Sequence, residues 1–311
     1  MVTSLNPAHP TPMQNSTPAF HLARRGRAHG PADLLIDLPH GATERAHYDA
    51  VRSRLAGPLP EGLEAFFFVN TDIGVTEVAE DLARRLVAAR PERSVVILRS
   101  LVPRTFVDCN RTLAGDQPDG MTSGLHEYIR HPADRRRLLG LHRDYRAASE
   151  RLHEEVCAGG GIALALHSYA PRSIDVPIAD DIVTSLRRAY RPAVYRTWPE
   201  RPEVDLITET MEGEDLSPRA LAADLAARYA GLGLSVGRNA TYRLHPATMG
   251  YRHALRYPNR VLCLELRRDR IAAPFRPFAP SPIGPRKVAR LAGPLVEALA
   301  AHFAAGGARR G

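Results

Sequence analysis

The chain of 311 residues contains little cysteine and no long apolar run. Its three cysteines, Cys109, Cys157 and Cys263, are widely spaced, which excludes a disulfide framework and a CxxC metal site, so we expect buried thiols. No run of about eighteen apolar residues occurs, and residues 1–30 lack the apolar core of a secretion signal. The sequence therefore predicts no membrane span and no export, and we expect a cytoplasmic protein.

Lysine is almost absent as well, because Lys287 is the only one. The net charge of +8 therefore comes from arginine, and such an excess raises the question of a nucleic-acid partner. The arginines are scattered among acids, as where Arg84 and Arg85 follow Asp81, and no nucleic-acid signature with interleaved aromatics accompanies them. This pattern is typical of a solvated surface and predicts no nucleic-acid partner.

The composition, with 44% apolar and 24% charged residues, is that of a globular protein. Residues 1–30 are an exception, because they hold four prolines and a basic run at Arg24, Arg25 and Arg27, and they show no helical or strand period. We interpret residues 1–30 as a flexible N-terminal arm and residues 31–311 as one domain.

Short apolar runs alternate with amphipathic stretches after residue 31, which predicts a single α/β domain with a central mixed, mostly parallel sheet flanked by helices. The expected strands are 34–38, 65–69, 95–98, 162–166, 193–195, 204–207, 234–236 and 261–266. The expected helices are 75–89, 135–156, 217–229 and 285–303. Ser217 before Pro218 indicates an N-cap followed by a proline in the first turn.

Polar side chains follow or interrupt three of these strands. His40 comes just after 34–38, His167 directly follows 162–166, and Glu265 lies within 261–266. Functional groups of open α/β sheets gather at the carboxyl edge. One histidine after a strand is most often a packed loop residue, but two histidines at equivalent strand ends, with an acid on a third strand, indicate a site.

Two histidines at one edge suggest a zinc ion, since imidazole is the commonest zinc ligand and catalytic zinc takes three protein ligands. The third ligand is Asp72, in the loop after 65–69, or Glu77 in the next helix. The helix dipole explains an acid at Glu77, which favours Asp72. Helix capping by residues 70–72 is an equally good explanation of Asp72, so the spacing leaves its role open.

These motifs together resemble one protein family. The motifs that carry the resemblance are, in order, Pro39-His40-Gly41, Asn70-Thr71-Asp72, Val107-Asp108-Cys109-Asn110-Arg111, His167-Ser168, Asn239, Gly250-Tyr251 and Leu264-Glu265. In these motifs the chain is similar to the N-formylglutamate amidohydrolases over residues 34–268, and that family resembles zinc carboxypeptidases and aspartoacylases in fold.

The resemblance implies that His40, Asp72 and His167 hold one zinc ion and that Glu265 is the general base. A carboxylate suits that role, because it can take a proton from water and return it to a leaving amine. A carboxylate inside an apolar strand is also costly unless it has a partner or a function.

The resemblance also implies that Asn110 and Arg111 hold a carboxylate of the substrate. The planar fork of arginine matches a carboxylate with two hydrogen bonds, which lysine cannot do. A surface ion pair of Arg111 with Asp108 or Asp116 is the alternative.

Further residues are expected near the substrate. Arg104 either stabilises the oxyanion of the transition state, contacts the substrate or is a solvated surface residue. Asn239 and Tyr251 are expected to bind the substrate. We expect the loop that carries Arg243, His245, Tyr251 and His253 to wall the pocket.

The chain departs from the family pattern near the second histidine. Ala165 and Leu166 stand where an aspartate usually precedes it, so the carboxylate that orients the metal-bound imidazole is absent or comes from elsewhere. Tyr145-Arg146 replaces a Tyr-His pair, with His142 one turn earlier, and Cys109 replaces a leucine.

These departures lie near the pocket, so the resemblance does not fix N-formylglutamate itself as the substrate. We expect a small N-formyl or N-acyl amino acid, or a peptide-like amide with a nearby carboxylate. Alternatives are a peptidase or peptide-tailoring enzyme with a larger substrate and a non-catalytic binding protein on the same fold. Glu265 argues against the binding protein, which has no need of a carboxylate there.

Overall fold

A computed structural model describes residues 17–113 and 124–307 of the chain. Seven strands form one mixed sheet in the order β1-β3-β2-β4-β7-β5-β6. Its strands are β1 (Phe20–Gly26), β2 (Leu34–Leu38), β3 (Ser94–Ser100), β4 (Ile162–Tyr169), β5 (Val204–Ile207), β6 (Val236–Arg238) and β7 (Val261–Arg267). Pairing is antiparallel between β1 and β3 and between β5 and β7, and parallel in the other four pairs.

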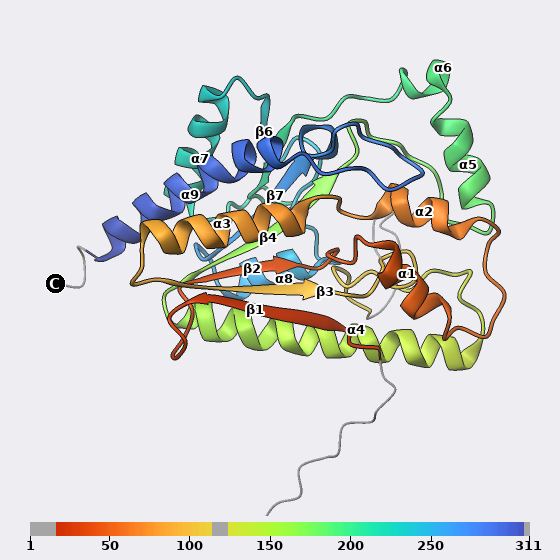
Figure 1. Cartoon of the computed structure of the whole chain (residues 1–311), viewed down its shortest axis with the longest axis horizontal. Helices are drawn as coiled ribbons and strands as arrows, with labels where there is room; N and C mark the ends of the chain where they lie inside the picture. Colours follow the sequence, from red (N-terminus) through yellow and green to blue (C-terminus); the bar gives the residue numbers. More distant parts are fainter. Residues whose placement is uncertain (1–16, 114–123, 308–311) are drawn as a thin grey trace, which may run out of the picture.

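Helices cover both faces of the sheet (Figure 1). They are α1 (Arg45–Arg52), α2 (Leu63–Asn70), α3 (Val75–Ala89), α4 (Pro132–His153), α5 (Ile182–Ala189), α6 (Pro192–Tyr195), α7 (Arg219–Gly231), α8 (Met249–Arg256) and α9 (Pro285–Gly307). A π-helical segment (Glu154–Ala158) extends α4, and a short 3-10 helix (Arg268–Arg270) follows β7. The predicted single α/β domain with a mixed, mostly parallel sheet is confirmed.

The alternation of side chains along β2 divides the core into two clusters. Leu34, Ile36 and Leu38 pack in the cluster that includes α3, α7 and α9, whereas Leu35 belongs to the cluster that includes α4. Asp37 shares the face of Leu35. The sheet therefore has two buried faces, as a mostly parallel sheet requires.

Two predicted strands are helices. Residues 65–69 lie in α2, where five consecutive apolar side chains are buried, and periodicity cannot separate such a run from a buried strand. Residues 193–195 lie in α6, which begins at Pro192. The other predicted strands are present, although β6 begins only at Val236. The predicted helices are all present with small shifts. The N-cap of α7 is Pro218 and not Ser217, whose hydroxyl donates to Asp215.

The prediction of a flexible arm over residues 1–30 is wrong for residues 20–26, because these residues form β1 at the edge of the sheet. Its backbone pairs with β3 from Phe20 opposite Ser100 to Gly26 opposite Ser94. Most of its side chains are exposed or half-buried, so the strand rests on backbone hydrogen bonds and leaves little apolar pattern in the sequence. Residues 1–16 of the expected arm lie outside the described residues.

Helix α9 has the length and apolar composition of a membrane-spanning helix between Pro285 and Ala305, and half of that window is buried in the domain. Its apolar side packs against α3 and α7 through Leu291, Leu295 and Leu299. The fold thus accounts for this helix as a core element. All three cysteines are buried free thiols, as expected. The cytoplasmic location stays a prediction.

Candidate active site

A tight turn after β2 places His40. The Gly41 amide donates to the Leu38 carbonyl at 3.1 Å, and a Cβ at Gly41 would lie 2.6 Å from Arg99 Cγ. Only glycine allows this close approach. The His40 side chain is thereby turned into the protein and is buried.

Asp72 lies between two helices, α2 and α3, rather than after a strand. The N-cap of α3 is Gly74, with a φ of 81°, and no side chain caps this helix end, so capping does not explain Asp72. Thr71 ties the loop to the His40 turn, because its hydroxyl donates to the Ala42 carbonyl at 3.0 Å. Glu77 lies on the exposed face of α3 and outside the cluster described next.

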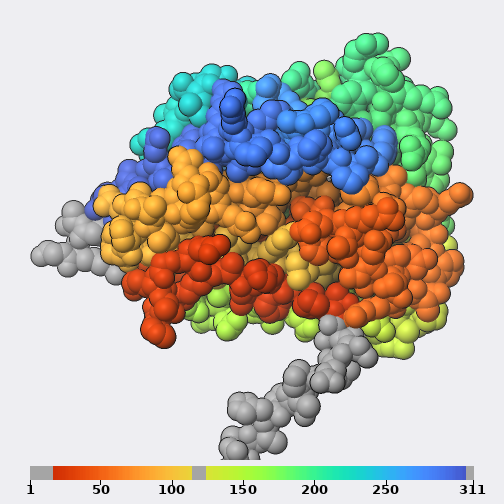
Figure 2. Space-filling model, viewed as in Figure 1, coloured from red at the N-terminus to blue at the C-terminus, as the bar shows by residue number. Residues whose placement is uncertain are grey.

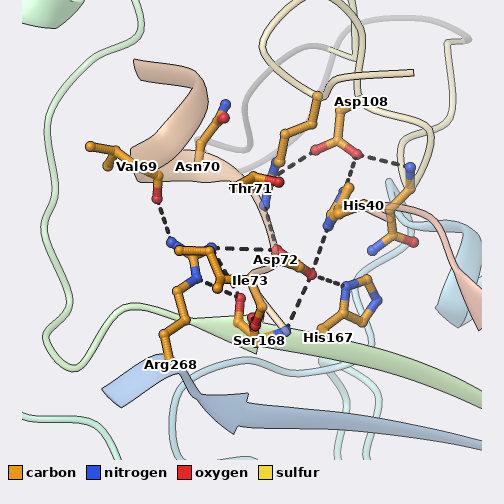
Figure 3. A network of polar contacts seen from close by, with 12 residues as sticks. His40, Val69, Asn70, Thr71, Asp72, Ile73, Asp108, His167, Ser168 and Arg268 are labelled. Atoms are coloured by element: carbon orange, nitrogen blue, oxygen red, sulfur yellow. Dashed lines mark hydrogen bonds and ion pairs between the residues drawn. The ribbon is translucent and has the colours of Figure 1, made fainter. Parts of the chain in front are cut away.

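The structure brings His40, Asp72 and His167 together (Figure 3). Asp72 Oδ2 lies 3.2 Å from His40 Nδ1 and 3.0 Å from His167 Nδ1, and it accepts the Ser168 amide at 3.3 Å. One ligand atom of each residue lies within 4.8 Å of the others. The three side chains are buried, so the cluster is a closed set of two imidazoles and one carboxylate.

Burial alone would raise the pKa of Asp72, but the neighbouring His40 and His167 lower it well below its usual range. A buried arginine also contacts Asp72. Arg268 donates to Asp72 Oδ1 at 3.4 Å, to the Ser168 carbonyl at 3.0 Å and to the Val69 carbonyl. It therefore joins the loop of Asp72 to the end of β4. The sequence analysis missed Arg268, whose only signal is its place after the strand of Glu265.

Asp108 is the second residue that the sequence analysis missed as part of the site. Its Oδ1 lies 2.7 Å from His40 Nε2 and accepts the Asn110 amide at 2.8 Å. Its Oδ2 accepts Arg104 at 3.1 Å. Burial raises the pKa of Asp108, but His40 and Arg104 outweigh burial and lower it well below its usual range. Asp108 therefore stays ionised and orients the His40 ring, as a carboxylate behind a metal-binding imidazole does.

Glu265 lies on β7 directly opposite His167 on β4. Its carboxyl group is buried, and Oε2 has no hydrogen-bond partner among the described residues. Burial raises the pKa of Glu265 to about 7, although nearby His167 partly opposes this shift. A buried carboxyl group with an unpaired oxygen and such a pKa is suited to exchange protons near neutral pH.

Two cavities meet at Glu265. We call the first the α5 chamber, of about 460 Å³, which Asp72, Ile178, Leu186 and Arg201 help to line. The second, of about 450 Å³, is the β6 chamber, which His40, Asn110, Met211 and Arg243 help to line. Arg104, Arg111, Thr241, Tyr242 and Glu265 line both. The His40, Asp72 and His167 cluster therefore lies where the two chambers join.

The two shared arginines differ in their environment. Arg104 pairs with Asp108 and lies 3.8 Å from Asp72. Burial lowers the pKa of Arg104, but the two carboxylates outweigh burial and raise it above its usual value. Arg104 is therefore a charged residue of the site and not a solvated one. Arg111 is more loosely held, at 4.0 Å from Asp108, and its buried Nε has no hydrogen-bond partner among residues 17–113 and 124–307. Burial lowers the pKa of Arg111, and Asp108 only partly opposes this effect. Arg111 is therefore available to an anion. Asp116 lies outside the described residues.

The loop before β7 meets the expectation only in part. Arg243 and His245 line the β6 chamber, but Tyr251 and His253 lie on α8 and line neither chamber. Tyr251 is partly buried and packs against the core, and its expected contact with the substrate stays a prediction. Asn239 lines the β6 chamber, but its side-chain oxygen accepts the backbone amides of Thr208 and Glu209. Asn239 thus shapes the chamber wall.

Ala165, which stands where the family has an aspartate before His167, lies opposite an acid on the neighbouring strand. Ala165 pairs with Asp37 of β2, and Asp37 accepts hydroxyl hydrogen bonds from Tyr145 and Ser149 of α4. A buried carboxylate is therefore present beside the expected position, on the next strand. His142 binds the Arg111 carbonyl at 2.8 Å and so supports the loop of Arg111.

Comparison with known proteins gives a consistent result. The model of the family described as N-formylglutamate amidohydrolase matches residues 32–272. The structure is similar to an N-formylglutamate amidohydrolase from Ralstonia eutropha JMP134, with a TM-score of 0.56, 17% identity and coverage of 93% of this chain and 100% of that one. A gene product from Agrobacterium tumefaciens matches with a TM-score of 0.51, 19% identity and coverage of 93% and 96%.

A metallo-carboxypeptidase from Pseudomonas aeruginosa also matches, with a TM-score of 0.37, 14% identity and coverage of 90% of this chain and 60% of that one. No curated protein gives a significant match. The family match covers most of the chain, and the motifs that carry the sequence resemblance lie within it. The chain therefore belongs to the N-formylglutamate amidohydrolase family, whose members are hydrolases of amide bonds.

Proposed function

We propose that the chain is a zinc-dependent hydrolase that cleaves the amide bond of an N-acyl amino acid, N-formyl compounds included. One observation carries the proposal: a cluster of two imidazoles and a carboxylate lies where two chambers join, beside the buried carboxyl group of Glu265, whose Oε2 has no partner in the described part of the chain. The family membership supports the reaction type.

His40, Asp72 and His167 fit a catalytic zinc ion, since two imidazoles and one carboxylate leave a position open for water. Asp108 behind His40 and Arg268 behind Asp72 fix two of these side chains in place. When bound, zinc lowers the pKa of a water ligand from 15.7 toward about 7 and polarises a carbonyl oxygen.

Glu265 is the proposed general base and acid. Its unpaired oxygen takes a proton from water while the water oxygen adds to the amide carbon. The carbon–nitrogen bond then breaks, and Glu265 returns the proton to the leaving nitrogen. The products are a carboxylic acid and a free amino acid.

Arg104 and Arg111 have separate proposed roles. Arg104 stays charged beside the cluster, where it stabilises negative charge that develops on the carbonyl oxygen. Arg111 and Asn110 hold the carboxylate of the amino acid, because the buried Nε of Arg111 has no hydrogen-bond partner among the described residues. Asn110 lines the β6 chamber, which we assign to the amino-acid side of the substrate.

The test is a screen of zinc-loaded protein against N-formyl, N-acetyl and longer N-acyl amino acids with acidic, basic and neutral side chains. Release of free amine is measured. We expect turnover with at least one N-acyl amino acid and none after Glu265→Gln. A zinc-loaded, folded protein that cleaves none of these compounds contradicts the proposal and favours a binding protein.

A further inference from the structure

The α5 chamber has no role in the proposed function so far. An amide placed at Glu265 has two sides, and the β6 chamber takes the amino-acid side. The α5 chamber then faces the acyl side, because it opens from the same junction. A formyl group has only two heavy atoms, each of a size comparable to the roughly 30 Å³ share of a water molecule. It would leave most of the 460 Å³ empty.

The wall of the α5 chamber is largely apolar on one side. It is built by α2 and by the segment between β4 and β5, which includes α5 and α6 and forms the lobe at the upper right of Figure 2. Ile174, Ile178 and Leu186 of this segment and Val69 of α2 contribute side chains. Ile174 and Ile178 are half-buried in the chain as it stands. Such a wall fits methylene groups of an acyl chain.

Arg201 gives the chamber a fixed positive charge. Its guanidinium lies 5.0 Å from the ring centre of Tyr169 and 5.4 Å from that of Tyr242. It donates to the Ser173 hydroxyl at 2.9 Å and to the Tyr242 hydroxyl at 3.0 Å. These neutral contacts orient the guanidinium but do not neutralise it. None of the ion pairs among residues 17–113 and 124–307 includes Arg201.

The other arginines of this region differ from Arg201 in this respect. Arg104 and Arg268 both pair with Asp72, and Arg172 pairs with Glu200. Arg201 is oriented on the wall of a cavity and forms no ion pair with a described residue, although its charge acts on the nearby carboxyl groups of Glu265 and Asp205. An arginine in this setting matches a carboxylate of a ligand. Arg201 therefore adds a second anion-binding group to the one that Arg111 provides.

We infer that the α5 chamber is an acyl subsite for an acyl group of several carbons that ends in a carboxylate, which Arg201 binds. The inference rests on the proposed function and specifies its substrate as an N-acyl amino acid derived from a dicarboxylic acid. The reaction needs only water: the amide bond breaks, a dicarboxylic acid leaves the α5 chamber and the free amino acid leaves the β6 chamber.

The experiment compares kcat/KM for one amino acid that carries different acyl groups, with zinc-loaded protein. Succinyl, glutaryl and adipoyl groups are set against butyryl, pentanoyl and hexanoyl groups of equal length, and against formyl. We expect the best dicarboxylic acyl group to exceed both formyl and its uncharged counterpart by at least about tenfold. Fastest cleavage of the formyl compound overturns the acyl subsite and leaves the proposed function standing. Failure to cleave any compound overturns both.

Variants then test Arg201 itself. Arg201→Gln is expected to lower kcat/KM for the best dicarboxylic acyl group about ten- to hundredfold and to change its uncharged counterpart less than about threefold. Arg201→Lys, which keeps the charge, is expected to recover part of the loss. Arg187→Gln is the matched control, since Arg187 lies on α5 over the ring of Phe278 and outside the chamber. An equal loss with both acyl groups would make Arg201 a structural residue and overturn its assigned role.

The apolar wall has a separate test. Ile178→Trp fills part of the α5 chamber, so we expect the ratio of kcat/KM for the best dicarboxylic acyl group over formyl to fall at least about tenfold. An unchanged ratio means that the acyl group lies elsewhere and overturns the assignment of the chamber.

Discussion

Two buried clusters adjoin strand β2, and each combines one aspartate with two histidines. The first is the candidate metal centre at the carboxyl end of the strand. The second consists of Asp37 on β2, His153 in the last turn of α4 and His253 on α8, and its ligand-type atoms also lie within 4.8 Å of one another. Residue types and spacing alone therefore do not distinguish them.

Their hydrogen bonds do distinguish them. In the second cluster both oxygens of Asp37 accept hydroxyl groups, from Tyr145 and Ser149, and Ser149 also contacts His253 Nε2 at 3.2 Å. The rings of His153 and His253 stack in parallel with centroids 3.6 Å apart. Burial lowers the pKa of both histidines, so the rings stack as neutral groups.

The first cluster has a different setting. Its histidines both face one oxygen of Asp72, charged residues surround it, and two chambers reach it. None of the three residues of the second cluster lines either chamber. The comparison indicates that a candidate metal centre is distinguished by a cavity that reaches it and by charged residues that contact its ligands. The second cluster has neither and is a hydrogen-bond network that joins α4 and α8 to the sheet.

The largest expected effect is on metal content. Wild-type protein purified without chelator should hold about one zinc per chain, because only the first cluster is set up as a ligand set. His167→Ala should abolish the bound zinc and the activity, whereas His253→Gln should keep one zinc. Metal analysis by mass spectrometry after dialysis measures both. Two zinc ions in the wild type and one in His253→Gln would show that the clusters are alike.

The next effect separates metal binding from catalysis. Glu265→Gln removes the proposed base without removing a proposed ligand, so zinc content should stay at one while kcat falls by about 10²- to 10⁴-fold. Glu297→Gln is the matched control, since Glu297 is exposed on α9 and pairs with Arg228. Turnover and zinc content are measured on the same preparations. Wild-type turnover in Glu265→Gln would place the base elsewhere.

A smaller effect concerns the charge behind Asp72. Arg268→Gln removes the contact to Asp72 Oδ1, so we expect zinc affinity to fall about ten- to hundredfold. Arg267→Gln is the control, because Arg267 is equally buried but pairs with Glu200 and Asp269. Competition with a zinc chelator measures the affinities. Equal losses in the two variants would mean that the end of β7, and not the contact to Asp72, determines affinity.

The parts of the site that the sequence predicted depend on local pattern. His40, His167 and Glu265 sit at or in strands that read as apolar runs, and parallel strands bring their carboxyl ends to one edge. Asp72 was also expected near them. Residues 65–69 before it form a helix and not the predicted strand, but the loop that follows this helix still places Asp72 at the carboxyl edge of the sheet. The α/β class followed from the same alternation of runs.

The missed parts depend on contacts between distant segments. Arg268 reaches Asp72 across 196 positions, and Asp108 reaches His40 across 68. No periodicity reports such pairs, so Asp108 appeared only within a motif and as an alternative partner of Arg111, and Arg268 was not singled out. The position of Tyr251, which packs against the core and lines neither chamber, likewise depends on how α8 packs against β7.

The last expected effect concerns stability alone and is the acid sensitivity of the second cluster. Burial lowers the pKa of His253 from 6.5 to about 2. The unfolded chain therefore binds a proton at this residue below pH 6.5, but the folded chain does not until about pH 2. The free energy of unfolding should fall by up to about 1.4 kcal/mol per pH unit as the pH drops through that window.

His253→Gln removes this contribution, so the variant should be less stable than wild type at pH 7 but should lose stability less steeply between pH 6.5 and 4.5. Urea unfolding at matched zinc concentrations measures the difference, and any loss of zinc affects both proteins alike. His21→Gln on the exposed edge strand β1 should follow the wild-type slope. Parallel slopes for wild type and His253→Gln would mean that His253 is already charged in the folded protein, and the second cluster would then resemble a charged site rather than a neutral network.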